Sequence, residues 1–378
     1  MRIIMVVGAR PNFVKIAPIM KESKKYSKMD IILVHTGQHY DREMSKAFFE
    51  DLDIPKPDIC LGIGSGSHAV QTGAIMAAFE KICIDKRPDI VVVVGDVNST
   101  LGCSIVSAKL HIPVAHVEAG LRSGDRSMPE EINRIVTDAV SSIFFTTCRE
   151  ANDNLKKEGV ASDKIYFVGN VMIDTLIKAR DAISGNEKPL VKNDEYALLT
   201  LHRPCNVDDE TSFKKIVKGI SEISKKIPVL FPAHPRTQKK IREYRMGRSF
   251  ISQVPGKNRP ICLANAVNLT GPLSYVDFLH VMKRAKLVFT DSGGIQEETT
   301  VLGIPCLTLR DSTERWITVH EGTNEIVGTN VSAIVKNTNR ILNGAWKKGN
   351  IPRYWDGKAA ERIVRVLNDF RAESKERK

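Results

Sequence analysis

The chain has 378 residues, of which 42% are hydrophobic and 26% are charged. This length favours two domains, and this composition is typical of a soluble globular protein rather than a disordered one. The formal net charge of +12 invites a nucleic-acid interpretation, but the only dense basic run lies in residues 375–378. We therefore expect no nucleic-acid partner, and clefts that suit anionic ligands.

Two further features argue against a membrane protein or a secreted protein. The longest apolar strand-like run, residues 90–94, is far shorter than the roughly 20 residues of a membrane-spanning helix. Residues 1–7 are apolar but lack a cleavage-like region, so they predict a first strand and not a signal peptide. The seven cysteines are scattered and never form a Cys-x-x-Cys pair. This usage indicates a reducing cytoplasm, without a disulfide framework or a structural zinc site.

Short apolar runs alternate with amphipathic stretches along the chain, which predicts an α/β fold with parallel sheets covered by helices. In the first half we predict strands at residues 3–7, 31–35, 90–94, 114–117, 143–146 and 166–168, and a helix at 100–110. In the second half we predict strands at residues 196–201, 229–232, 287–290 and 305–309, and a last helix at about 357–370.

A stretch without periodicity, residues 182–194, marks the predicted break between domains. We therefore predict an N-terminal domain over residues 1–175 and a C-terminal domain over residues 190–355. A C-terminal helix within residues 356–378 follows. The sequence leaves open whether this helix packs back on the N-terminal domain or packs on the C-terminal domain.

Unusual polar residues come at or just past the carboxyl ends of predicted strands. They are Arg10, Asp96, Glu118, His202, His234 and Ser292. In open α/β sheets this edge is where ligands bind. Two such edges facing each other would form one cleft between the domains.

Two turns are candidates for anion binding. Residues 290–294 lead from a strand into a helix, where Gly293 and Gly294 allow close approach and the exposed amides suit a phosphate. The alternative is an ordinary turn that is capped by the side chain of Ser292. In the first turn Arg10 and Lys15 flank a helix start and are suited to a diphosphate; the alternative is two solvated charges.

Two nucleotide-binding signatures are missing from the sequence. Residues 62–66 (GIGSG) lack the Gly-x-Gly-x-x-Gly spacing, and the chain has no Gly-x-x-x-x-Gly-Lys-Ser/Thr loop. A dehydrogenase and a P-loop kinase are therefore disfavoured.

Carboxylates from neighbouring strand ends are candidates for acid and base catalysis. Asp96 follows four valines and a glycine, Glu118 ends the next strand, and Glu130 and Glu131 open a helix. The alternative for the last two is simple electrostatic preference for a helix N-terminus.

His202 and His234 each follow a strand and directly precede an Arg and a Pro residue. A single histidine in such a place is more often structural, but the repetition favours function. No His-x-x-x-His cluster predicts a metal site.

Taken together, these stretches closely resemble the non-hydrolysing UDP-N-acetylglucosamine 2-epimerases. The matching segments are GARP (8–11) with Lys15, TGQHY (36–40), GDVNST (95–100), HVEAGLR (116–122), PEEINR (129–134), LHR (201–203), DSGGIQEE (291–298) and TER (313–315). They span about residues 1–330 in the family's order, so the ordered set is far more specific than any one segment.

The resemblance implies two Rossmann-like domains whose parallel sheets face a central cleft, as in glycosyltransferase-B folds, and a homodimer. It also implies elimination of UDP to 2-acetamidoglucal and re-addition, giving UDP-N-acetylmannosamine without a redox cofactor. The catalytic residues that it implies are Asp96, Glu118, Glu130 and His202. The substrate-binding residues that it implies are Arg10, Lys15, Glu131, His234, Phe278, Ser292, Gly293, Gly294, Glu298 and Arg315.

Alternative functions stay open at this point. A relative that epimerises a modified UDP-sugar, such as a 2,3-diacetamido uronic acid, would use the same chemistry with an additional cation for the carboxylate. A glycosyltransferase of the same fold would need an acceptor site. The hydrolysing epimerases are disfavoured by the first turn, and a non-catalytic nucleotide-sugar sensor would bind without exchanging a proton.

Overall fold

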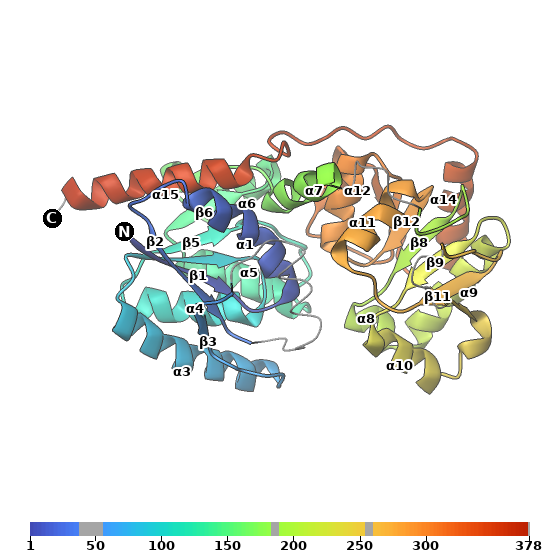
Figure 1. The fold of residues 1–378 in the computed structure, drawn as a ribbon, viewed down its shortest axis with the longest axis horizontal. Coiled ribbons are helices and arrows are strands. Elements are labelled where there is room, and N and C mark those ends of the chain that lie inside the picture. Colours follow the sequence, from blue (N-terminus) through green and yellow to red (C-terminus); the bar gives the residue numbers. More distant parts are fainter. Residues whose placement is uncertain (38–55, 183–188, 254–259, 377–378) are drawn as a thin grey trace. The chain divides into compact units, whose positions relative to one another are not determined.

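The computed structural model describes residues 1–37, 56–182, 189–253 and 260–376. Within this part the chain forms two compact units, and Figure 1 labels many of their helices and strands. Unit 1 comprises Met1–Lys178 and Arg353–Lys378, and unit 2 comprises Ala179–Pro352. The chain therefore leaves unit 1, completes unit 2 and returns to unit 1.

Unit 1 is built on a seven-stranded parallel sheet in the order β3-β2-β1-β4-β5-β6-β7. Its strands are β1 (Arg2–Val7), β2 (Asp30–His35), β3 (Ile59–Cys60), β4 (Ile90–Val94), β5 (Val114–Val117), β6 (Ile143–Thr146) and β7 (Ile165–Phe167). Its helices are α1 (Arg10–Ser23), α3 (His68–Lys86), α4 (Asn98–Lys109), α5 (Pro129–Val140), α6 (Arg149–Lys157), the short η1 (Ser162–Lys164), α7 (Val171–Ala182) and α15 (Ala359–Glu376).

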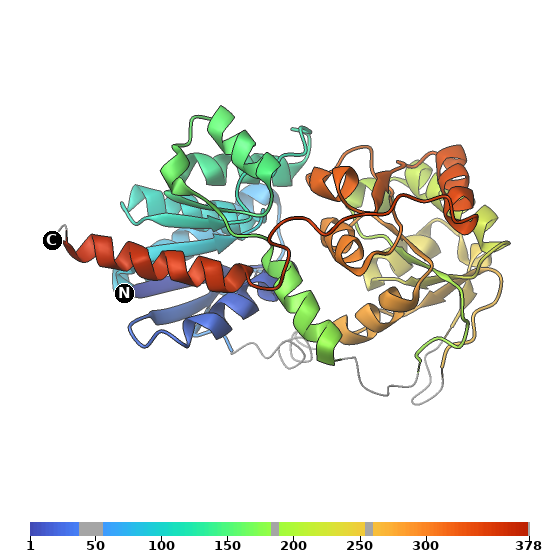
Figure 2. The same cartoon turned by 90° about the horizontal axis from the view of Figure 1, so that it is seen from above.

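The central strands β1, β4, β5 and β6 of unit 1 are buried on both faces, which explains their continuous apolar sequences. Every residue of β4 is buried. Ile4 and Val6 of β1 belong to the same core as Ile75 and Phe79 of α3, so alternate side chains of the strand face that helix. Helix α15 packs against α1, and in Figure 2 it lies beside the N-terminal strand of the same unit.

Unit 2 repeats this architecture with a second seven-stranded parallel sheet, in the order β10-β11-β9-β8-β12-β13-β14. Its strands are β8 (Ala197–Thr200), β9 (Val229–Pro232), β10 (Ile251–Ser252), β11 (Val267–Thr270), β12 (Leu287–Thr290), β13 (Cys306–Thr308) and β14 (Asn324–Ile326). Its helices are α8 (Pro204–Val207), α9 (Glu210–Ser224), α10 (Pro235–Glu243), the short η2 (Gly247–Ser249), α11 (Tyr275–Arg284), α12 (Gly293–Leu302), α13 (Trp316–His320) and α14 (Val331–Leu342).

Each sheet contains a point at which the strand order reverses. In unit 1 the chain runs from β1 outward to β2 and later from β4 outward to β5, so the reversal lies between β1 and β4. In unit 2 it lies between β8 and β12. Ligands of open α/β sheets bind at such a reversal, outside the carboxyl ends of the strands.

The returning segment is anchored in the core of unit 1. The indole of Trp355 is buried and donates to the carbonyl of Thr147 at 2.9 Å. At the start of α15 the carboxylate of Asp174 accepts the amides of Ala359 and Ala360 at 3.1 and 2.7 Å. These contacts tie α7 to the last helix.

The predicted α/β class with two parallel sheets is confirmed. Four strands were not predicted: β3, β10, β11 and β14. Two of them have two residues each, and β11 has the sequence VNLT, in which the buried Asn268 interrupts the apolar pattern. No helix in the described part of the chain is long and apolar enough to cross a membrane.

Candidate functional site

Unit 1 gathers its polar site at the carboxyl ends of β1, β4 and β5, beside the reversal of the strand order. Asp96 follows β4 and Glu118 follows β5, as the sequence predicts. The backbone of Glu118 has a φ of +70°, which is uncommon for a residue with a side chain. The turn therefore holds this carboxylate in a conformation that ordinary strand ends do not adopt.

A buried ion pair joins Lys15 of α1 to Glu118. The ammonium contacts Oε2 of the carboxylate, and both side chains are at least nine-tenths buried. Gly95 lies against the pair, since a Cβ atom there would sit 3.4 Å from the ammonium and 3.5 Å from the carboxylate oxygen. Lys15 therefore contacts a catalytic candidate directly, and its contact with the diphosphate stays a prediction.

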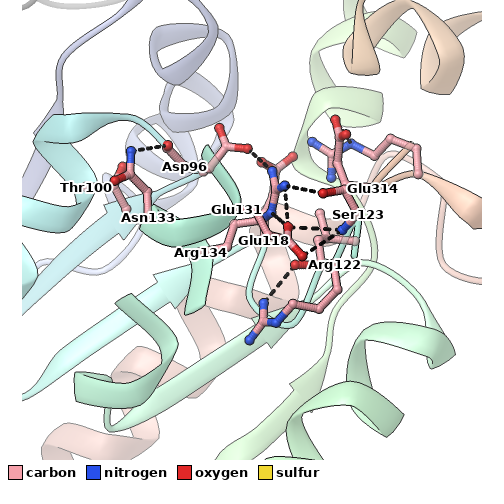
Figure 3. A network of polar contacts seen from close by, with 12 residues as sticks. Asp96, Thr100, Glu118, Arg122, Ser123, Glu131, Asn133, Arg134 and Glu314 are labelled. Atoms are coloured by element: carbon pink, nitrogen blue, oxygen red, sulfur yellow. Dashed lines mark hydrogen bonds and ion pairs between the residues drawn. The ribbon is translucent and has the colours of Figure 1, made fainter. Parts of the chain in front are cut away.

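A second cation, Arg134 of α5, links two further carboxylates (Figure 3). Its guanidinium is 2% exposed and contacts Oδ2 of Asp96 and, at 2.5 Å, Oε2 of Glu131. Asp96 itself is a quarter exposed, so its carboxylate is accessible from outside.

Glu131 is the anchor of the loop that precedes α5. Its oxygens accept the amides of Ser123 and Gly124 at 3.0 Å. Burial opposes ionisation, but these amides and Arg134 hold the pKa of Glu131 below its ordinary value. Glu131 therefore holds the loop before α5 in place, and its contact with the substrate stays a prediction.

Glu130 differs from its neighbour because its side chain is only half-buried. It opens α5 directly after Pro129 at the first helical position. The side chain of Arg10 lies outside the described part of the structure, although its backbone begins α1.

A buried network of charged and polar side chains lies beside Gly95 and Glu118. His116 of β5 contacts Asp138 of α5 at 2.6 Å through Nδ1 and the carbonyl of Gly95 at 2.9 Å through Nε2. Asp138 also accepts the amide of Gly120 and pairs with Arg122 at 2.7 Å. Burial opposes ionisation of Asp138, but His116 and Arg122 hold its pKa below the ordinary value.

The anion-binding turn of unit 2 lies where we expected it, between β12 and α12. The side chain of Ser292 makes no capping hydrogen bond, which contradicts the alternative of an ordinary capped turn. Gly293 is packed tightly, since a Cβ atom there would lie 2.6 Å from Oε1 of Glu314. With Gly294, it begins α12, so the first-turn amides are suited to a phosphate.

Buried charges surround this turn. Glu298 is completely buried in α12 and accepts a hydrogen bond from Tyr275 of α11 at 2.9 Å. Burial raises the pKa of Glu298 to about 7, although the Tyr275 hydroxyl opposes this shift. Arg315 pairs with Glu297 at 3.1 Å and is 6% exposed. Phe278 lies on α11 and is half-buried.

The two predicted histidines occupy different environments. His202 follows β8, is half-exposed, and contacts the buried Asp291 at 2.8 Å through Nδ1. His234 is the N-cap of α10, and its Nδ1 accepts the amide of Arg236 at 3.2 Å. This cap favours a structural role for His234.

The sequence interpretation missed Arg134, His116, Asp138 and Asp291 as functional candidates. His116, Arg134 and Asp291 stand inside segments that carry the resemblance, which is the signal that could have found them. No cluster of three or more metal-ligating side chains occurs among the described residues.

Comparison with known proteins places this geometry in a family. The family model described as UDP-N-acetylglucosamine 2-epimerase matches residues 21–368. A UDP-N-acetylglucosamine 2-epimerase of Methanocaldococcus jannaschii is 42% identical over 97% of this chain and 99% of its own length. A UDP-2,3-diacetamido-2,3-dideoxy-D-glucuronate 2-epimerase of Pseudomonas aeruginosa is 40% identical over 97% and 99%.

A solved structure agrees with these sequence matches. The crystal structure of the M. jannaschii UDP-GlcNAc 2-epimerase in complex with UDP-GlcNAc and UDP matches with a TM-score of 0.86 at 41% identity. The match covers 97% of this chain and 99% of that one.

Proposed function

The chain belongs to the UDP-N-acetylglucosamine 2-epimerase family, and we propose that it interconverts UDP-N-acetylglucosamine and UDP-N-acetylmannosamine without hydrolysing them. The observation that carries this proposal is the group of carboxylates at one sheet edge of unit 1. Asp96 and Glu118 follow neighbouring strands, and each contacts a buried cation.

The reaction needs a proton removed from one face of carbon-2 and another delivered to the opposite face. A base takes the carbon-2 proton while the bond between carbon-1 and the diphosphate oxygen breaks, which gives 2-acetamidoglucal and UDP. A proton then adds to carbon-2 from the other face, and UDP re-adds at carbon-1. Asp96, Glu118 and Glu130 are the groups that we assign to these transfers.

Unit 2 supplies the groups for the nucleotide. The amides at the start of α12 and the guanidinium of Arg315 suit the leaving diphosphate, whose negative charge grows as the bond breaks. Glu298 is assigned to the ribose hydroxyls and Phe278 to the uracil. Arg10 of unit 1 is assigned to the diphosphate as well.

The test is incubation with UDP-N-acetylglucosamine in heavy water, without added metal or NAD, followed by proton NMR. Deuterium at carbon-2 together with UDP-N-acetylmannosamine is expected. Bound substrate with an unchanged carbon-2 proton and no product would contradict the proposal.

Asp96→Asn, Glu118→Gln and Glu130→Gln are expected to lower the epimerisation rate by about 100-fold or more, since each removes a proton-transfer group. Asp30→Asn is the matched control, because it makes the same charge change at an exposed pair with Arg2. A carboxylate variant that exchanges carbon-2 deuterium at the control's rate would lose its assigned role.

A second candidate substrate is supported by the P. aeruginosa relative, whose identity of 40% is close to the 42% of the M. jannaschii relative. That candidate is UDP-2,3-diacetamido-2,3-dideoxy-D-glucuronate, which carries an additional carboxylate. Parallel assays with both sugars under the same conditions decide between them by their values of kcat/KM.

We propose a homodimer in the cytoplasm as the working form. All seven cysteines are free thiols, which supports a reducing compartment. Light scattering coupled to gel filtration checks the assembly, and a monomeric mass for the active enzyme would contradict it.

A further inference from the structure

The side chain of His202 contacts the buried carboxylate of Asp291. Its Nδ1 atom lies 2.8 Å from Oδ1 of Asp291, and its side chain is 51% exposed, whereas Asp291 is completely buried. The two ring nitrogens of an imidazole lie on opposite edges. When Nδ1 faces a buried carboxylate, Nε2 is therefore the nitrogen that can meet a ligand.

Asp291 is held in place by several donors. Both of its oxygens accept the amide of His202 at 3.1 Å, and Oδ2 accepts the amide of Arg203 at 2.9 Å. The side chain of Asn206 donates to Oδ2 at 3.2 Å and also holds the carbonyl of Leu309 at 2.8 Å. The carboxylate therefore has one fixed orientation beneath the ring.

These hydrogen-bond donors stabilise the ionised form of the Asp291 carboxylate. Burial opposes ionisation of Asp291, but His202 and the backbone amides hold its pKa below the ordinary value. An anion at Oδ1 can only accept, so the hydrogen bond requires the proton on Nδ1 of His202. Cys205 interacts electrostatically with Asp291, and also with Arg203 and Arg310.

The position of the pair connects it to the nucleotide turn. Asp291 is the residue directly before Ser292, which is the N-cap of α12. The pair sits between β8 and β12, where the strand order of unit 2 reverses. One residue thus links the imidazole to the turn that is suited to phosphate.

We propose that Asp291 is a positioning residue that fixes the Nδ1-protonated form of His202, so that Nε2 faces the leaving diphosphate. This inference rests on the proposed function, since only a departing anion gives the oriented imidazole its role. A ring free to flip or to change tautomer would present the correct nitrogen only part of the time.

The first experiment reads the tautomer directly, by nitrogen-15 NMR of the imidazoles in the free protein. The signals of His202 are assigned by their loss in His202→Gln. Neutral His202 is expected to carry its proton on Nδ1 in the wild type. In Asp291→Asn the amide group can donate to Nδ1, so the proton is expected to move to Nε2.

The second experiment measures epimerisation by Asp291→Asn, His202→Gln and the double variant. Asp291→Asn is expected to lower kcat by about 100-fold or more with little change in KM, because the loss is confined to the transition state. The double variant is expected to be no slower than His202→Gln, since Asp291 acts through the histidine. Glu195→Gln is the control: the same charge change at an exposed pair with Lys286.

Three results would overturn the inference: a wild-type proton on Nε2, an Asp291→Asn enzyme as fast as the control, or additive losses in the double variant. If Asp291→Asn does not fold, the wild-type tautomer alone decides. The NMR result does not depend on turnover. A protein with the Nδ1 proton in place that makes no UDP-N-acetylmannosamine would therefore count against the proposed function and not against the pairing.

Discussion

The buried ion pair between Lys15 and Glu118 leads to a prediction about the free energy of unfolding. Both side chains are at least nine-tenths buried, so Lys15→Met removes the charge opposite a carboxylate that water hardly reaches. We expect the free energy of unfolding to fall by about 3–5 kcal/mol in urea titrations. The control is Lys25→Met, whose exposed ammonium pairs with Glu22 and should matter little. Equal effects of the two variants would show that the buried pair is not stabilising.

Glu298 makes a prediction about pH. Burial raises its pKa to about 7 in the folded protein, above the ordinary value of 4.5. Between pH 4.5 and about 7, the folded state therefore keeps a proton on Glu298 that the unfolded state has lost. The stability from this group is complete below about pH 4.5 and is lost as the pH rises through 7. At pH 8 the ionisation of Glu298 lowers the free energy of unfolding by about 3 kcal/mol.

Glu298→Gln should remove that cost, so unit 2 is expected to gain thermal stability at pH 8 and little at pH 4.5. UDP affinity, measured by calorimetry, is expected to fall in the same variant. A pH dependence identical to that of the wild type would assign the stability change to another group. Tyr275→Phe is a useful companion, because it removes the hydroxyl that donates to Glu298.

For single residues, the sequence predicts where a carboxylate lies in the fold but not which cation it contacts. Asp96 and Glu118 could be found because each follows an apolar strand, and a strand's end is visible in the pattern. Their partners could not, since Arg134 is 38 residues from Asp96 and Lys15 is 103 residues from Glu118. Hydrophobic periodicity reports burial, and it carries no information on which buried charges meet.

Among the elements, the turn between β7 and α7 gives the clearest prediction. Gly169 has a φ of +89°, and a Cβ atom there would lie 2.0 Å from the carbonyl oxygen of Tyr354 in the returning segment. Gly169→Ala adds both backbone strain and a collision with backbone. We expect a loss of about 3 kcal/mol or more in the free energy of unfolding.

Gly159 provides the matched control for Gly169. Its φ is +88°, but no atom lies within 4 Å of the Cβ position. Gly159→Ala should therefore cost only the backbone strain, about 1 kcal/mol. The difference between the two variants measures the close approach of the returning segment. If both alanines cost the same, that approach is not rigid.

Predictability among the elements follows the strength of the apolar signal. β4, with the sequence IVVVV, was predicted to the residue, because a strand buried on both faces is a continuous apolar run. β14, with the sequence NEI, was missed, since it is short and its buried Asn324 takes part in side-chain hydrogen bonds. Tertiary pairing with β13 makes it a strand.

For the whole molecule, the path of the chain predicts that unit 1 is incomplete without its last segment. Trp355, Ile363 and Leu367 are at most 1% exposed, and all belong to residues 353–378. Residues 1–182 alone would leave their core surface in water. We expect that fragment to unfold without cooperativity, and the same fragment joined to 353–378 by a flexible linker to melt in one sharp transition.

Unit 2 should behave differently, because it is continuous in sequence and has its own core. Residues 189–352 are expected to fold alone and to bind UDP, since the turn at α12, Glu298 and Arg315 all lie within them. The fragment should not exchange the carbon-2 proton, because Asp96, Glu118 and Glu130 belong to unit 1. Calorimetry with UDP and the heavy-water assay check the two halves of this prediction. Exchange by the fragment would move the proton-transfer groups out of unit 1, whereas a folded fragment without UDP affinity would move the nucleotide site.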